Sequence, residues 1–212
     1  MGAKAKEGIV AQIKDAIVRG RWKSGERIVE AQLCRELGEG RSRVREALRQ
    51  VAQDGFIELI PNTGAVVKEV SQKDIAQIYD LMGVLEGLSM RIATPTLTEK
   101  QMREIESFIG KMERYQKDKF KMADYNFRFH EYMTNLGGNT RLTSFVNLMR
   151  AQASRMGLHS FYNPQQVRFS LVEHRKIFYA VQERRPEKVE KYIRQHYLSA
   201  KNRLIQYINN TL

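Results

Sequence analysis

The 212-residue sequence has one cysteine, four prolines, one tryptophan and no long hydrophobic run. The single cysteine, Cys34, excludes a disulfide framework and a cysteine-based zinc finger, and it fits the reducing cytoplasm. No apolar stretch approaches the length of a membrane span, and the first residues lack the apolar core of a signal peptide. We therefore expect a cytoplasmic protein with no membrane segment. The scarcity of proline favours long, uninterrupted helices.

Acidic residues are also scarce relative to basic ones. The sequence contains 36 Lys and Arg against 24 Asp and Glu, which gives a formal net charge of +12. Such an excess favours a polyanionic partner. However, residues 1–70 hold 13 basic and 10 acidic residues, whereas residues 71–212 hold 23 and 14. The local arrangement of residues, rather than the bulk charge, must therefore carry the argument for DNA binding.

The first 70 residues follow the order helix, helix, helix and β-hairpin. Helical periodicity and glycine breaks separate the helices, and a Pro/Asn/Gly cluster separates two apolar strands. The predicted elements are a helix that ends near Gly20, a turn at residues 25–27, helices at about 30–36 and 41–54, and strands at 56–60 and 65–67. This order predicts a winged helix-turn-helix.

Helical periodicity continues from residue 71 onward. The six predicted helices cover residues of about 72–93, 99–116, 119–135, 140–159, 165–184 and 187–209. We therefore predict a mainly α protein. An N-terminal winged helix-turn-helix domain, with three helices plus a β-hairpin, occupies residues 1–70. A six-helix antiparallel α-bundle occupies residues 71–212.

The third predicted helix opens with an arginine-rich segment that suits DNA recognition. Its apolar positions fall on one face, which leaves four polar residues of the first turns outside: Arg41, Ser42, Arg43 and Arg45. A helix end of this kind enters the major groove, where arginine reaches guanine edges or phosphates. The alternative is a solvated surface helix. A hairpin that follows directly, with Gly64 at its tip, favours DNA binding because glycine permits close approach to a phosphate.

Many spaced residues in this region agree with one known family. They are Gly25-Glu26-Arg27-Ile28, Glu30, Leu33, Leu37-Gly38, Arg41, Val44-Arg45-Glu46-Ala47-Leu48, Gly55-Phe56-Ile57, Pro61 and Gly64. Residues 8–70 thus resemble the winged helix of GntR-family bacterial transcription regulators. The resemblance implies that Arg41, Ser42, Arg43, Arg45 and the wing glycine Gly64 contact DNA. The sequence departs from the family at Gly40, where Ser or Thr is usual, and at Arg43, where Pro or Thr is frequent, so we expect a different operator.

The four histidines all follow residue 71, and three of them suggest a metal site. Asn126 and His130 are spaced i, i+4 and share a helix face, while His174 and His196 fall near the middle of the last two predicted helices. Three imidazoles and an amide oxygen inside a bundle suit a transition metal. The alternative is that these are ordinary core or surface histidines, and spacing alone favours that alternative.

A second resemblance supports the metal interpretation. The segments Asn126-x-x-Phe129-His130, Glu173-His174-x-x-Ile177-x-x-Ala180 and His196-Tyr197-Leu198 are similar to the FCD effector domain of the FadR subfamily. The resemblance covers about residues 72–209. It implies that Asn126, His130, His174 and His196 bind a divalent transition metal of the Zn, Ni or Mn type. An effector, typically an organic acid, would bind against that metal.

Several nearby residues are assigned other roles. Asp124 lies about 240° round the helix from His130 and should face elsewhere. We expect His159 to be structural. Met82 stands where many relatives carry an arginine that contacts an acidic effector, so Arg91, Arg155 or Arg168 would have to replace it, or the effector is less acidic. Five aromatic residues are predicted to be core: Tyr79, Phe127, Phe129, Tyr162 and Phe178.

The leading hypothesis is a DNA-binding transcriptional regulator, most simply a repressor, that responds to a small-molecule effector. A homodimer would place two recognition helices on a pseudo-palindromic double-stranded DNA operator. One alternative is a regulator that has lost its metal and binds its effector directly. The other is a metal-dependent hydrolase. The sequence lacks H-E-x-x-H, a nucleophile elbow and a phosphate loop, so we do not expect an enzyme.

Overall fold

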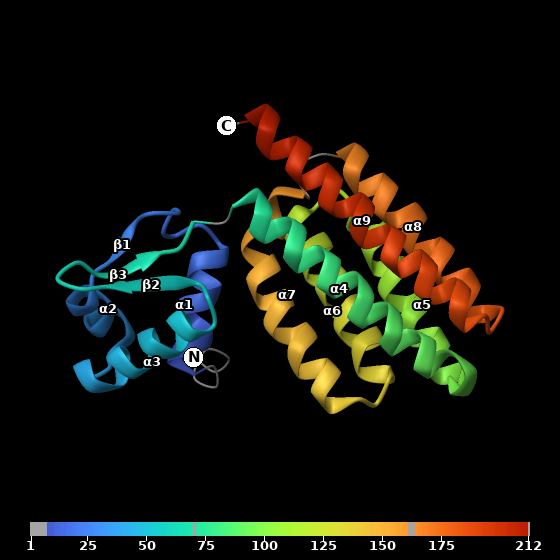
Figure 1. The fold of residues 1–212 in the computed structure, drawn as a ribbon, viewed down its shortest axis with the longest axis horizontal. Helices are drawn as coiled ribbons and strands as arrows, with labels where there is room; N and C mark the ends of the chain where they lie inside the picture. Colours follow the sequence, from blue (N-terminus) through green and yellow to red (C-terminus); the bar gives the residue numbers. More distant parts are fainter. Residues whose placement is uncertain (1–7, 70, 161–163, 212) are drawn as a thin grey trace. The chain divides into compact units, whose positions relative to one another are not determined.

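The computed structural model describes residues 8–69, 71–160 and 164–211, with side chains placed within 8–69, 71–153 and 164–209. The chain divides into two compact units, residues 1–71 and 72–212 (Figure 1). The first unit combines helices with a small sheet, and the described part of the second is helical. The predicted mainly α fold is therefore confirmed.

The first unit is a winged helix-turn-helix. Its elements are α1 (Ile9–Val18), β1 (Arg27–Ile28), α2 (Glu30–Leu37), α3 (Arg41–Gln53), β2 (Ile57–Ile60) and β3 (Gly64–Val67). The strands pair antiparallel in the order β1-β3-β2. The sequence predicted only a turn at residues 25–27, but Arg27 and Ile28 pair with β3 and add a third strand. A two-residue strand has no periodic pattern to reveal it.

An apolar face holds α3 against the rest of the first unit. Val44, Leu48 and Val51 recur every three or four residues on α3 and are buried, and α3 packs against α1. Gly38 ends α2 at a φ of 67°, a left-handed conformation that glycine adopts without strain. The chain can therefore turn sharply between α2 and α3, which leaves the start of α3 at the surface.

The second unit is a bundle of long helices. Its elements are α4 (Gln72–Ala93), the short 3-10 helix η2 (Thr94–Thr96), α5 (Glu99–Arg114), α6 (Lys119–Leu136), α7 (Thr140–Ser160), α8 (Pro164–Gln182) and α9 (Pro186–Thr211). A capping box begins α5. The hydroxyl of Thr98 accepts a hydrogen bond from the backbone N–H of Gln101, whose side chain accepts one from the backbone N–H of Thr98.

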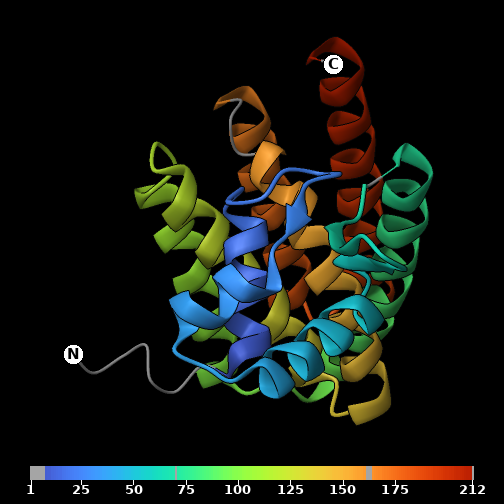
Figure 2. The same cartoon turned by 90° about the vertical axis from the view of Figure 1, so that its left-hand side faces the viewer.

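Close packing of α4 against α9 builds one wall of the bundle. Figure 1 and Figure 2 show the two helices side by side. Two glycines of α4 permit this approach, because a Cβ at Gly83 would lie 3.1 Å from the Cβ of Tyr197, and one at Gly87 would lie 3.2 Å from the Cγ of Glu190. The packing places Tyr197 against the buried side chain of Glu86 on α4.

The aromatic core was predicted in part. Tyr79, Phe129 and Phe178 are buried, but Phe127 is 40% exposed and the prediction was wrong for it. Helical periodicity on α6 marked a wider apolar face than the neighbouring helices cover. Tyr162 lies outside the described residues. Among the helices that the structure describes, none is both long and apolar enough to cross a bilayer.

Candidate DNA-binding surface and metal centre

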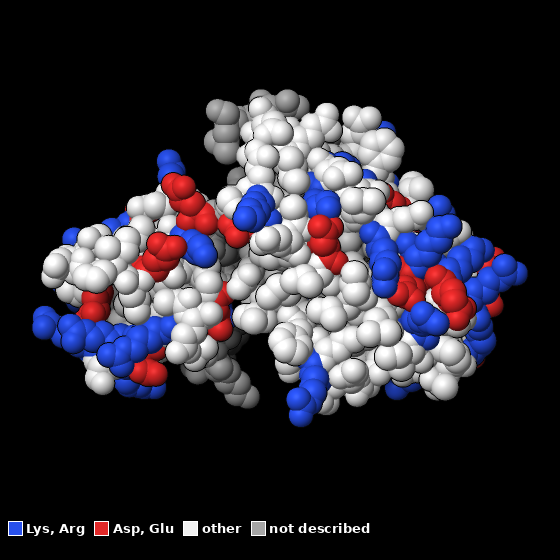
Figure 3. Space-filling view, in the orientation of Figure 1, with Lys and Arg blue, Asp and Glu red and all other residues white. Residues whose placement is uncertain are grey.

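The start of α3 presents a cluster of polar side chains. The four residues predicted to contact DNA there, Arg41, Ser42, Arg43 and Arg45, are all exposed. Figure 3 shows a band of Lys and Arg side chains across the part of the first unit where Figure 1 places α2 and α3. Gly40 precedes the helix, and no side chain caps it. The first N–H groups of α3 have no partner within the helix and can therefore meet a phosphate.

Two of these arginines are paired with acidic side chains but remain accessible. Nη1 of Arg43 lies 2.7 Å from a carboxylate oxygen of Glu39, and Nε of Arg45 lies 3.0 Å from Oε2 of Glu30. The arginine side chains keep 71% and 66% of their surface exposed. Exposed pairs of this kind contribute about 0.2–1 kcal/mol. A phosphate can therefore replace the carboxylates.

A hollow of about 280 Å³ lies between α3 and the wing. Its lining residues are Arg27, Ile28, Glu30, Arg45, Leu48, Arg49, Leu59, Gly64 and Ala65. Gly64 has a φ of 93°, and a Cβ there would lie 3.8 Å from Nε of Arg27. Arg27 and Arg49 are cations beside the predicted DNA contacts that sequence reasoning did not select. Arg27 had been assigned to a turn, so nothing indicated that it would stand beside the wing.

The structure brings three of the predicted metal ligands together inside the second unit. His130 of α6, His174 of α8 and His196 of α9 are all buried, and one ring nitrogen from each lies within 4.8 Å of the others. Bonds from zinc to histidine nitrogen are about 2.0–2.1 Å long. Small rotations of the rings would therefore allow one ion to contact all three nitrogens.

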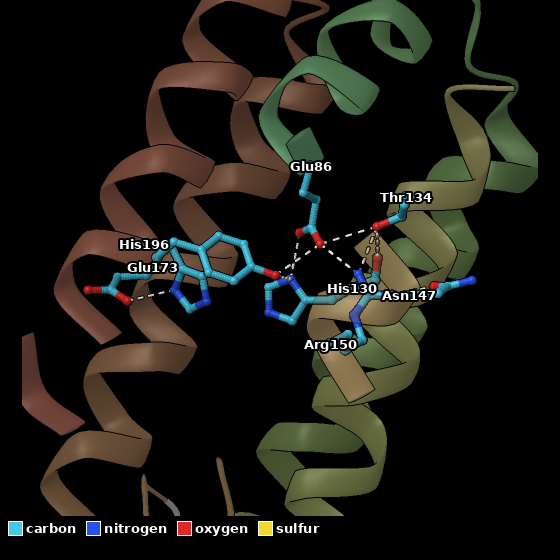
Figure 4. A network of polar contacts seen from close by, with 8 residues as sticks. Glu86, His130, Thr134, Asn147, Arg150, Glu173 and His196 are labelled. Carbon is cyan, nitrogen blue, oxygen red and sulfur yellow. Dashed lines mark hydrogen bonds and ion pairs between the residues drawn. The ribbon is translucent and has the colours of Figure 1, made fainter. Parts of the chain in front are cut away.

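A buried carboxylate on α4 holds the first of these histidines. Oε1 of Glu86 lies 2.6 Å from Nδ1 of His130, and Oε2 accepts hydrogen bonds from Arg150 at 2.9 Å and Tyr197 at 3.0 Å (Figure 4). Burial by itself would raise the pKa of Glu86, but His130, Arg150 and Tyr197 lower it below its usual value. Burial lowers the pKa of His130, and Glu86 only partly offsets this.

A second carboxylate, Glu173 on α8, holds His196. Its Oε2 lies 2.7 Å from Nδ1 of His196, and Arg203 of α9 donates to both carboxylate oxygens at 2.9 and 3.0 Å. Burial opposes ionisation, but the hydrogen bonds from His196 and Arg203 lower the pKa of Glu173 to about 2. Glu173 belongs to the sequence motif that includes His174, yet it contacts the histidine of the neighbouring helix, His196.

The remaining predicted ligands carry polar atoms without partners. Both ring nitrogens of His174 and the amide oxygen of Asn126 are buried with no hydrogen-bond partner among the described residues. Burial, with the nearby His196 and His130, holds the pKa of His174 well below its ordinary value, so its ring is neutral. A buried unpaired polar group costs about 1–3 kcal/mol. The lone-pair nitrogen of a neutral imidazole and an amide oxygen are chemically suited to a divalent transition metal.

The structure also places some of the other residues that the sequence analysis considered. Asp124 faces solvent in an ion pair with Arg128, as expected from its helical position. Arg91 is exposed and paired with Glu190, which removes it as an anion partner inside the bundle. Met82 is buried. The side chains of Arg155 and His159 lie outside the described residues.

A hollow of about 680 Å³ lies where α6 and α8 begin. Its lining residues are Gln116, Lys117, Asp118, Lys119, Pro164, Val167 and Arg168. Three of these residues carry positive charge, and one of them, Arg168, was among the cations proposed to replace the missing arginine at position 82. Both helices continue from this hollow to the predicted metal ligands.

The arrangement suits binding more than catalysis. A catalytic metal needs a positioned acid or base beside it. The two carboxylates next to the triad, Glu86 and Glu173, are each held by a histidine and an arginine. Neither is free to take a proton from a metal-bound water. The His triad is therefore better suited to holding an ion than to catalysis.

Comparisons with known proteins agree with both halves of this description. A model of the FCD domain matches residues 77–199, and a model of bacterial regulatory proteins of the gntR family matches residues 5–67. An uncharacterized HTH-type transcriptional regulator, YdhC of Bacillus subtilis, is 26% identical over 88% of this chain and 84% of its own length. The HTH-type transcriptional repressor RspR of Escherichia coli is 26% identical over 81% of this chain and 76% of its own length.

Solved structures share the fold. Escherichia coli McbR/YncC superposes with a TM-score of 0.81 at 20% identity, covering 93% of this chain and 95% of that one. A putative transcriptional regulator GntR from Rhodococcus sp. RHA1 has a TM-score of 0.77 at 19% identity, with coverage of 93% and 96%. At these identities the likeness concerns the fold alone.

Proposed function

This chain belongs to the FCD family and carries a GntR-type domain before its FCD domain, and we propose that it is a repressor that leaves its operator when an effector binds. It is a DNA-binding transcriptional regulator rather than an enzyme. Residues 1–70 would bind DNA. Residues 71–212 would bind the metal and the effector and would hold two copies together.

The exposed arginine cluster at the start of α3 carries the DNA-binding proposal. Arg41, Ser42, Arg43 and Arg45 would enter the major groove, and Gly64 would bring the wing to a phosphate. A gel shift of the full chain against DNA from its own promoter region tests this. We expect a sequence-selective complex that weakens steeply with salt, because phosphate contacts release counterions. Equal binding to unrelated DNA, or no complex at all, would contradict the proposal.

The unpaired polar atoms of the buried centre carry the metal proposal. His130, His174, His196 and Asn126 would hold a divalent ion of the Zn, Ni or Mn type, which acts as a Lewis acid toward the effector. Asn126 contributes a neutral oxygen, so the ion would be held less tightly than with an aspartate. The rival hypothesis, a regulator without a metal, predicts that protein purified without a His tag contains no stoichiometric ion.

The charge balance of the centre favours an anionic effector, such as an organic acid. Imidazole and amide side chains bind a metal in their neutral forms and add no negative charge to it. Each nearby carboxylate is matched by an arginine, Glu86 by Arg150 and Glu173 by Arg203. A bound divalent ion would therefore keep uncompensated positive charge. The hollow at the start of α6 and α8, with its three cations, offers an acid a favourable approach.

A row of exposed apolar residues on α4 supports the homodimer. Four side chains share one face of the helix and are each at least 39% exposed: Leu81, Val84, Leu88 and Ile92. Contiguous exposed apolar surface of this kind marks interaction sites. Two copies joined there would bring two winged helices to a pseudo-palindromic operator. A coupling free energy of about 1–3 kcal/mol between effector and operator would suffice for a switch.

A further inference from the structure

We propose that Glu86 and Glu173 are positioning residues of the metal centre, each of which fixes one histidine so that its Nε2 atom faces the ion. The inference rests on the proposed metal site and goes beyond its ligand set. The two carboxylates lie on different helices, yet each joins one histidine of the triad to one arginine. We call these arrangements the two relays, His130–Glu86–Arg150 and His196–Glu173–Arg203.

The first relay is locked by contacts from three helices. Glu86 of α4 has no exposed surface. One of its oxygens meets His130 of α6, and the other accepts from Arg150 of α7 and Tyr197 of α9. A carboxylate so surrounded has a fixed orientation, and its contact with Nδ1 restricts how far the His130 ring can rotate.

The second relay has the same order of groups but a simpler support. Both oxygens of Glu173 bind the guanidinium of Arg203, and one of them also meets His196. Bidentate pairs between arginine and carboxylate restrict orientation as well as adding energy. Glu173 therefore presents a fixed acceptor to Nδ1 of His196, although a quarter of its side-chain surface is exposed.

The chemistry of the pair decides which nitrogen is left for the ion. A carboxylate held by arginine can only accept, so the Nδ1 atom facing it carries the hydrogen. A neutral imidazole has a single N–H, and its Nε2 then keeps the free lone pair. Both relays thus prepare Nε2 of His130 and His196 as metal ligands before any ion arrives.

His174 is the exception among the three ligands. Its nitrogens have no hydrogen-bond partner among the described residues, and its ring packs 4.6 Å from that of Phe129, centroid to centroid. Nothing comparable to a relay selects its tautomer. We therefore expect two preset ligands and a third whose orientation is set by the ion itself.

Nitrogen NMR of the metal-free full chain tests the preset tautomers directly. Long-range proton–nitrogen correlations of labelled histidine distinguish Nδ1–H from Nε2–H rings. The proposal predicts Nδ1–H rings at His130 and His196. Glu173→Ala should change only the His196 signal to an Nε2–H ring or a tautomer mixture. Nε2–H rings at both positions in the wild-type protein would overturn the proposal.

Zinc affinity tests the consequence for the centre. Competition with a chromophoric chelator should show zinc binding about 10–100-fold weaker in Glu173→Ala than in wild type. Glu173→Gln keeps an acceptor oxygen without the charge, so its loss should be smaller. The matched control is Glu113→Ala, which removes another carboxylate bound at both oxygens by an arginine, Arg175. It should leave zinc affinity unchanged.

The outcomes separate this inference from the metal proposal. Wild-type protein that binds no zinc would contradict the metal centre itself. Wild-type protein that binds zinc, with Glu173→Ala binding as tightly as Glu113→Ala, would overturn only the positioning role. If Glu173 had only a structural role, Glu173→Ala would lower the unfolding temperature but would change neither the His196 tautomer nor the zinc affinity. Glu86→Gln tests the first relay in the same way. Once thermal unfolding has shown that this variant folds, it should bind zinc more weakly than wild type, as Glu173→Gln should.

Discussion

Nδ1 of His130 on α6 lies 2.6 Å from Oε1 of Glu86 on α4, and this contact ties the proposed metal centre to the helix that follows the wing. The wing strand β3 ends at Val67, and α4 begins at Gln72. A ligand that moves His130 would therefore act on the helix closest in sequence to the DNA-binding unit. This connection would give a bound effector a physical route to the operator, and several measurements can test the parts of the proposal.

Removal of one ligand should empty the metal centre. Wild-type protein purified without a His tag should contain about one transition ion per chain, measured by inductively coupled plasma mass spectrometry. His174→Ala should lose it, because a metal ligand is gone and no other group at that position can replace it. His159→Ala is the control and should keep the ion. Equal metal content in both variants would contradict the assignment.

Metal removal should destabilise the folded protein, and this effect should depend on the proposed metal ligands. An ion that binds only the folded chain stabilises it by about 2.7 kcal/mol when its free concentration is 100 times its dissociation constant. Thermal unfolding should therefore shift upward when zinc is added and downward with a chelator. His174→Ala should respond to neither. If the unfolding temperature of His174→Ala shifts with zinc as strongly as that of wild type, the ion binds elsewhere.

Replacing the neutral oxygen ligand by a charged one should tighten metal binding. Asn126→Asp adds a negative charge beside the ion at nearly constant shape, so its zinc affinity should exceed that of wild type in chelator competition. Asn126→Ala should bind zinc less tightly. Asn202→Asp, at an exposed position of α9, controls for the added charge and should have no effect. If Asn126→Asp binds zinc with the same affinity as wild type, Asn126 is not a metal ligand.

A charge on the apolar face of α4 should separate the two copies. Leu88→Glu places a carboxylate in the middle of the proposed interface, and light scattering after size exclusion should show a monomer where wild type is a dimer. Val172→Glu changes an apolar residue on α8 that is 68% exposed and should leave the dimer intact. If both variants remain dimers, the interface lies elsewhere.

The sequence was informative wherever a residue's role depends on its neighbours along the chain. Helical spacing located the six helices of the second unit, and Pro61, Asn62 and Gly64 marked the hairpin. Strand β1 was missed because two residues carry no periodicity and its pairing with β3 is non-local. Phe127 was misjudged because periodicity does not reveal how much of a helix face its neighbours cover.

The sequence pointed to the candidate ligands but not to the residues that support them. The family resemblance pointed to three histidines, His130, His174 and His196, whose ring nitrogens the fold brings within 4.8 Å of one another. Glu86 and Arg150 are 64 residues apart and meet only because α4, α6, α7 and α9 pack together. No local sequence pattern predicts a contact between residues so far apart, so the relays could be identified only from the structure.

The proposed function of this chain depends most on DNA recognition by the start of α3. Fluorescence anisotropy with promoter DNA, repeated over a series of salt concentrations, tests this with Arg43→Ala and Arg128→Ala. Both variants remove an exposed arginine from an i, i+4 ion pair, but Arg128 lies in the second unit. Arg43→Ala should weaken operator binding and reduce the salt slope by about 1, whereas Arg128→Ala should match wild type. Equal affinities and slopes for all three proteins would contradict the account.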